Sequence, residues 1–180
     1  MLCFFLTCYF FLFKALLRFT SNPKALSKFT TPTKIATVKA WAYFWKGWAY
    51  AQIGTLYIAG IVTDTAGKTS NTYVTHDAII SRSNYYYDLA VTTLGGANVA
   101  SDYNAILGNL IPASSQVGKG QLMTKDMWVR NINTLKARNI LLNKMSTFVN
   151  GVAGVTISKN AFSGVMTAAD WNNILTLTAN

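Results

Sequence analysis

The sequence contains no glutamate, and its 180 residues include only one histidine, two cysteines and six acidic residues, all of them aspartate. This shortage removes most of the side chains that enzymes use as general acids, general bases or metal ligands. The sequence also has no Gly-x-Ser-x-Gly motif and no cluster of His, Cys and acidic residues. We therefore expect no catalytic, metal-binding or cofactor-binding residues, and we do not expect an enzyme.

One short motif comes close to a nucleotide site. Gly67, Lys68 and Thr69 match the end of a phosphate-binding loop. That loop also needs a glycine at position 62, so that backbone N–H groups can wrap a phosphate, and the residue there is Val62. We interpret residues 64–67 as a turn that joins two strands.

Both cysteines, Cys3 and Cys8, lie in the apolar start of the chain. Cysteines in such surroundings usually behave as small apolar core residues. This placement favours a reducing compartment over a disulfide framework or a metal site.

Acidic residues are scarce relative to basic ones, which leaves a formal net charge of +10. The first acidic residue is Asp64, so the N-terminal third of the chain carries only positive charge. This excess could attract nucleic acid, an anionic membrane surface or an acidic partner, or it could simply keep the protein soluble. Because the lysines are spread out, we expect any nucleic-acid binding to be weak.

Residues 1–20 are almost wholly apolar, with Lys14 and Arg18 as the only charges. As a helix, residues 1–13 would be about 20 Å long, which is short of the roughly 30 Å of bilayer hydrocarbon. The basic residues follow the apolar run, whereas a signal peptide places them before it. Three interpretations remain open: a segment buried against another subunit, a membrane contact through residues 1–19, or a cleaved or misassigned start. The interface candidates in this segment are Phe4, Phe5, Phe10 and Phe11.

Residues 21–33 contain two prolines and several hydroxyl residues, which predicts a linker. After it, residues 34–96 form an aromatic-rich region in which aromatic and small residues alternate, as in β-strands. Lys46 and Gly47 are the expected hairpin loop between two such strands. Their aromatic face could stack bases of single-stranded nucleic acid, but packing in a core or subunit interface is the interpretation we favour. The interface candidates here are Trp41, Tyr43, Trp45, Trp48 and Tyr50.

Residues 97–180 predict three short capped helices. Each start combines a hydroxyl residue that can accept a backbone N–H, a nearby aspartate and an aromatic anchor. We expect Trp171, on the last of these helices, to be buried. The predicted caps and core anchors are Ser101, Asp102 and Tyr103; Thr124 and Trp128; and Thr167, Asp170 and Trp171.

Two of these helix starts, Ala-Ser-Asp-Tyr-Asn-Ala-Ile at 100–106 and Val-Met-Thr-Ala-Ala-Asp-Trp-Asn-Asn-Ile at 165–174, resemble phrases in tailed-bacteriophage virion proteins. Tail-fibre, collar and adaptor-like subunits are the most similar class. The resemblance covers roughly residues 98–180. It implies a structural subunit located in a virion and brings no catalytic residues with it.

The sequence as a whole predicts an α+β protein in which residues 34–180 form one compact domain. Its expected function is that of a virion structural subunit, with other virion subunits as partners and packing in a homo-oligomer or a larger assembly. The alternatives are a membrane-associated protein anchored by its N-terminal segment and a non-specific nucleic-acid binder.

Overall fold

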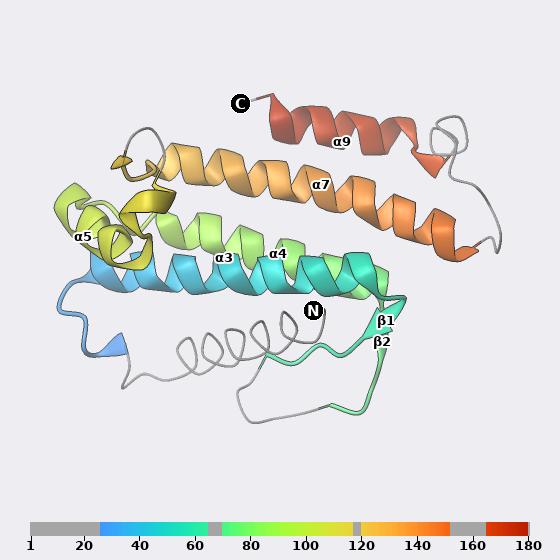
Figure 1. Ribbon diagram of the computed structural model, residues 1–180, viewed down its shortest axis with the longest axis horizontal. Helices are drawn as coiled ribbons and strands as arrows, with labels where there is room; N and C mark the ends of the chain where they lie inside the picture. The colour runs from blue at the N-terminus through green and yellow to red at the C-terminus, as the bar shows by residue number, and fades with distance from the viewer. Residues whose placement is uncertain (1–25, 65–69, 117–119, 152–164, 180) are drawn as a thin grey trace.

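A computed structural model describes residues 26–64, 70–116, 120–151 and 165–179. These residues form a bundle of helices with one sheet of two very short strands (Figure 1). The prediction of an α+β fold is therefore wrong, because the aromatic-rich region expected as a sheet is mostly helical. Residues 1–20, with the candidates Phe4, Phe5, Phe10 and Phe11, lie outside the described residues.

Helix α3 (Pro32–Leu56) occupies the stretch expected to form the aromatic hairpin. It begins where the Thr31 hydroxyl accepts a hydrogen bond from the Lys34 N–H at 3.3 Å, with Pro32 in the first turn, where a missing N–H costs nothing. Lys46 and Gly47 lie in the middle of the helix and form no turn.

The physical reason for this error is that α3 is covered on all sides. No residue from 33 to 55 is exposed, and a helix buried on every face shows no polar stripe with the helical period. Aromatic and alanine residues can then alternate as they do in a strand, although the alanines are strong helix formers.

A loop and a small hairpin connect α3 to the next helix. Strand β1 (Ala59–Gly60) pairs antiparallel with β2 (Val74–Thr75). Helix α4 (His76–Leu94) follows at once, and the Thr75 hydroxyl caps it by accepting from the Ala78 N–H at 3.4 Å. The tyrosines at 85–87, expected on a strand, lie in this helix.

The remaining elements are helices, in agreement with the expectation for residues 97–180. They are α5 (Ala100–Leu110), the short 3₁₀ helix η1 (Ala113–Ser115), α7 (Lys125–Gly151) and α9 (Ala168–Thr178). Helix α7 runs through Asn139, whose side chain is buried and hydrogen-bonded in the bundle.

Helices α3 and α4 form an antiparallel pair, α7 packs against both, and α9 lies on the outer side of α7 (Figure 1). Helix α5 packs near the start of α3, where Asp102 accepts a hydrogen bond from Thr31 at 2.6 Å and pairs with Lys34 at 3.4 Å. The hairpin lies at the opposite end of α3.

Close approach of α3 and α4 depends on Gly47 and Gly54. A Cβ atom at Gly47 would lie 2.8 Å from the Tyr87 ring and 3.0 Å from the Ser83 carbonyl oxygen. At Gly54 it would lie 2.9 Å from Ile80. These distances are shorter than a carbon contact permits, so the two helices can pack at this separation only with glycine on α3.

The main core lies where α3, α4, α5 and α7 meet, and Trp128 of α7 is its largest fully buried side chain. Its ring packs edge-on against Trp41 and Phe44 of α3, with centroid separations of 6.0 and 5.9 Å. Edge-to-face contacts of this kind add stabilisation beyond the burial of area. The aromatic side chains of α3 therefore help to hold the bundle together.

Candidate functional site

Five polar side chains from α3, α4 and the loop after β1 form a group that we call the charge cluster: Lys46, Tyr50, Asp64, Arg82 and Tyr86. Lys46 and Tyr50 are one turn apart on α3, and Arg82 and Tyr86 are one turn apart on α4. Asp64 reaches them from the loop, so the cluster joins three separate segments of the chain.

Asp64 is the centre of the charge cluster. Its carboxylate accepts hydrogen bonds from Arg82 and Tyr86, and from the Tyr50 hydroxyl at 3.2 Å. Burial alone would raise the pKa of Asp64, but the bonds from Arg82 and Tyr86 outweigh burial and hold that pKa below its ordinary value. Asp64 is therefore ionised at neutral pH.

Lys46 is the least favourably placed charge in the cluster. Only 3% of the residue is exposed, and its ammonium lies 4.1 Å from the centre of the Tyr86 ring. The pKa of Lys46 is lowered to about 8, chiefly by burial; the charge of Asp64 partly opposes this lowering, and the charge of Arg82 adds to it. Burial also raises the pKa values of Tyr50 and Tyr86, and the negative charge of Asp64 adds to this effect.

The geometry of the cluster suits a clamp better than a reaction. The Tyr50 hydroxyl lies 2.8 Å from the Thr63 carbonyl oxygen and accepts from the Thr63 N–H at 3.1 Å. Together with the Asp64 bonds, these contacts fix the loop after β1 against α3 and α4. The carboxylate has a low pKa and its oxygens are already hydrogen-bonded, so it is a poor proton acceptor at neutral pH.

A row of polar contacts joins α4 to α7. Lys136 pairs with Asp88 at 2.6 Å, and Asn139 donates to Ser83 at 3.1 Å and to Asn84 at 2.9 Å. One heptad after Lys136, Asn143 lies 2.8 Å from a ring nitrogen of His76. Buried polar groups must be paired, so this row penalises any sliding of α7 along α4.

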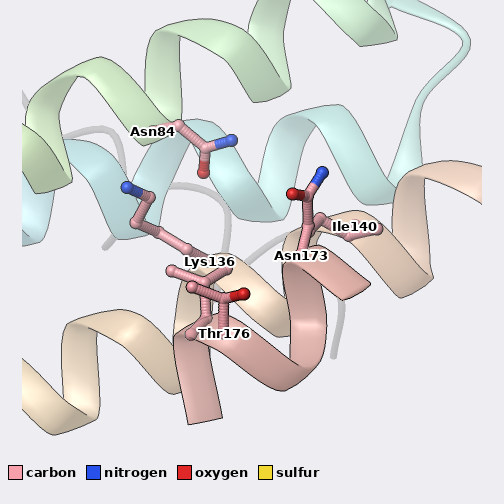
Figure 2. A pocket seen from close by; sticks show the side chains of 6 residues that line it. Asn84, Lys136, Ile140, Asn173 and Thr176 are labelled. Carbon is pink, nitrogen blue, oxygen red and sulfur yellow. The ribbon is translucent and has the colours of Figure 1, made fainter. Parts of the chain in front are cut away.

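A small pocket lies where α4, α7 and α9 meet (Figure 2). Its volume is about 250 Å³. Two aliphatic side chains and four polar ones line it: Ile140 and Leu177, with Asn84, Lys136, Asn173 and Thr176. No sequence pattern predicts this pocket, because its lining residues come from three helices far apart in the chain.

The aromatic interface candidates of residues 34–96 pack largely within the bundle. Tyr50 is fully buried, and Tyr43 stacks against Tyr86 at a centroid distance of 6.1 Å. The three tryptophans Trp41, Trp45 and Trp48 are half-buried and form an edge-to-face row along α3, with successive centroids 5.6 and 5.5 Å apart.

Among the predicted caps, Thr124 and Thr167 do cap helices. Thr124 accepts from the Met127 N–H at 3.2 Å. Thr167 and Asp170 form a reciprocal capping box, with bonds of 3.1 Å to the Asp170 N–H and 2.9 Å from the Thr167 N–H. Asp170 also pairs with Lys144 of α7 at 3.3 Å, which ties α9 to α7.

Two of the predictions for the helical region are wrong. Ser101 is not a cap, because α5 starts at Ala100 after Val99 and so contains Ser101 in its first turn. Trp171 is not buried: 43% of it is exposed, because α9 turns Ile174 and Leu177 towards the bundle and leaves Trp171 outside. The other anchors are placed as expected, with Asp102 in the first turn of α5 and both Tyr103 and Trp128 buried.

Large apolar side chains are exposed at the hairpin end of the bundle. Leu56, Tyr57 and Ile58 follow one another at the end of α3, and Tyr73 precedes β2. Their exposed fractions range from 44% for Tyr57 to 73% for Leu56. We call these four residues the hairpin-end patch. Periodicity did not identify this patch, because its exposure depends on where the helix ends.

In the part of the chain that the structure describes, no helix is long and apolar enough to cross a membrane. The described residues also contain no group of three or more His, Cys, Asp or Glu side chains that could hold a metal ion. Comparison with known proteins finds no matching family model and no significantly similar curated protein or solved structure.

Proposed function

We propose that this chain is a structural subunit that acts by packing against other chains. The observation that carries the proposal is the hairpin-end patch, where Leu56, Tyr57 and Ile58 follow one another with exposed side chains and Tyr73 is exposed just before the paired strand β2. Single exposed apolar residues are ordinary, but contiguous ones rimmed by polar groups are typical of contact surfaces between proteins. Tyrosine is also among the residues enriched in such surfaces.

The internal polar groups support the same proposal. The charge cluster and the polar row between α4 and α7 use their hydrogen bonds to fix the loop and the register of the helices. Such an arrangement suits a rigid scaffold that presents a fixed surface to its partners. It does not require movement or a reacting group.

The assembly that we propose is the particle of a tailed bacteriophage, in the tail, the collar or a fibre. This part of the proposal is supported by the phrases at 100–106 and 165–174. The capping box of Thr167 and Asp170, which belongs to the second phrase, starts a helix that exposes Trp171. An exposed tryptophan beside a fixed helix start suits a subunit contact.

Fractionation of virus-producing cells tests the proposal. Intact particles are purified on a density gradient, membranes are collected by flotation, and the chain is quantified in each fraction by mass spectrometry against a known particle protein. We expect the chain to follow the particles at a fixed ratio of several copies each. A chain that floats with membranes, or that is lost from particles on repeated purification, would contradict the proposal.

A further inference from the structure

We propose that the apolar N-terminal segment, residues 1–20, packs as a helix along α3 of its own chain, on the side that α4 and α7 leave uncovered. We call this side of α3 the third face; it consists of Val38, Ala42, Trp45 and Ala49. The inference goes beyond the proposed function, because it gives the segment a place within the chain. It also decides which side of the segment remains available to a partner.

The third face is distinct from the two sides of α3 that pack in the bundle. Gly47 and Gly54 lie on the side towards α4, where side chains of α4 approach them closely. Trp41 and Phe44 lie on the side towards α7, where both contact Trp128. With 3.6 residues per turn, the third face lies roughly 100° or more around the helix from both sides. No labelled helix of the described chain lies along the side of α3 away from α7 (Figure 1).

The third face is nevertheless covered. Ala42 is 0% exposed and Val38 is 7% exposed, yet neither belongs to the apolar clusters that the described residues form around α3. Trp45 is half-buried, and its ring contacts within the described chain are all with other aromatic residues of α3. Helix α5 packs near the start of α3, and the loop after β1 is held at Tyr50, towards α4. We therefore infer that residues outside the described ranges cover this face.

The N-terminal segment is the stretch that suits this position. Residues 65–69 and 117–119 are short, and residues 152–164 connect α7 to α9, which lies on the far side of α7 from α3 (Figure 1). The third face extends over about 17 Å of helix, and a helix of residues 1–20 would be about 30 Å long. Residues 21–31 are enough to turn the chain back, so the segment would run antiparallel to α3.

The segment carries a stripe of large apolar side chains that matches the third face. Its members are Leu2, Phe5, Tyr9, Leu12 and Leu16. They recur at alternating intervals of three and four residues, which places them along one side of a helix. The third face has the same alternating intervals, but two of its members, Ala42 and Ala49, are small. Large side chains opposite small ones allow two helices to approach closely and interdigitate.

The opposite side of such a helix carries the charges of the segment. Lys14 and Arg18 both lie away from the stripe, so packing against α3 would bury neither charge. Of the four interface candidates, Phe5 faces α3. The other three lie on the outer side: Phe4, Phe10 and Phe11. The inference therefore leaves these three rings available for a contact with another subunit.

Photo-crosslinking in the full chain tests the inference. A benzophenone amino acid replaces either Phe5, on the stripe, or Phe11, on the outer side, and mass spectrometry identifies the peptides that irradiation joins. Position 11 is the matched control, because both positions lose the same residue from the same segment. A second pair is made with the probe at position 5. Ala42→Trp enlarges the third face, and Ala78→Trp enlarges an exposed alanine of α4.

The probe at position 5 should join the segment to α3 peptides of the third face, in a product with the mass of one chain. Its yield should exceed that of position 11 by about tenfold or more, because an activated ring reacts only with atoms in contact. Ala42→Trp should reduce this yield to the level of position 11, since the larger side chain displaces the segment, and Ala78→Trp should not change it. The comparison of positions 5 and 11 stands even if Ala42→Trp fails to fold.

Equal yields at positions 5 and 11, or a probe at position 5 that joins to no part of α3, would overturn the inference. So would a folded Ala42→Trp variant with an unchanged yield. Products of doubled mass at position 5 would show instead that the segment packs against a second chain. The proposed function is decided separately by particle fractionation, which does not depend on where the segment lies.

Discussion

Replacing Lys46 with methionine should stabilise the protein at neutral pH, although it removes a residue from the charge cluster. The ammonium is buried, and burial lowers the pKa of Lys46 from 10.5 to about 8. A shift of this size corresponds to about 3 kcal/mol, at about 1.4 kcal/mol for each pH unit. Methionine fills a similar volume without charge, at the loss of a cation–π contact of about 1 kcal/mol. The expected net gain is about 1 to 3 kcal/mol at pH 7.

The sign of the pH dependence follows from the direction of the shift. Because the pKa of Lys46 is lower in the folded state, the folded state binds this proton less tightly than the unfolded state does. The full cost is present below pH 8 and fades as the pH rises towards 10.5. The advantage of the methionine variant should therefore shrink by about 2 kcal/mol between pH 7 and pH 9.5. Tyr50 and Tyr86 act in the opposite sense, because their raised pKa values make the folded state lose stability above about pH 10.

Urea denaturation at pH 7 and at pH 9.5, followed by circular dichroism, measures this effect. Taking the difference between variant and wild type cancels the contribution of the tyrosines, which both proteins share. Lys39→Met, on the same helix at a position that is only half-buried, is the control for a general effect of lost charge. A Lys46→Met variant that is less stable than the wild type at pH 7, or a difference that does not change with pH, would refute the reasoning.

Three further predictions concern other parts of the molecule. Gly47→Ala should destabilise the protein by about 1 to 3 kcal/mol in thermal unfolding, because the new methyl group meets Tyr87 at 2.8 Å. Gly108→Ala is the control, since the nearest neighbour of its new methyl group lies at 3.9 Å. This control variant should be as stable as the wild type or more stable by up to about 1 kcal/mol. Thr167→Ala should lower the stability of α9 by about 1 kcal/mol, measured by hydrogen exchange, because it removes the cap. Trp171 is exposed, so Trp171→Ala should cost less than the roughly 3 to 5 kcal/mol expected for a core aromatic residue. A loss in that range would mean that Trp171 is buried. DNA binding, measured by fluorescence anisotropy, should be independent of sequence and should weaken steeply with salt, and submicromolar binding at about 200 mM salt would contradict this.

The sequence was informative where a local rule determines the structure. The capping box of Thr167 and Asp170 depends on side chains three residues apart, and the structure has the same bonds. The helix that follows Thr124 and the burial of Trp128 could also be inferred from neighbouring residues. In the two caps the interacting groups lie within about one turn of each other, and Trp128 follows Thr124 by four residues.

The sequence misled where the outcome depends on distant partners. The alternation around Trp41 and Trp45 fits a strand, and only the packing of α4 and α7 against α3 explains why a helix can carry it. The helical period identified a face containing Trp171 but could not say which face of α9 is covered. The charge cluster and the pocket escaped prediction for the same reason, since each draws residues from three separate segments.

Imaging of purified virus particles at a resolution that traces side chains tests the central claim most directly. If the chain is a structural subunit that acts by packing, the particles will contain repeated copies of the α3, α4 and α7 bundle. The row of Trp41, Trp45 and Trp48 will be recognisable along α3, and the hairpin-end patch will lie against a neighbouring subunit. Particles in which no density fits this bundle, or in which the patch faces water in every copy, would contradict the account.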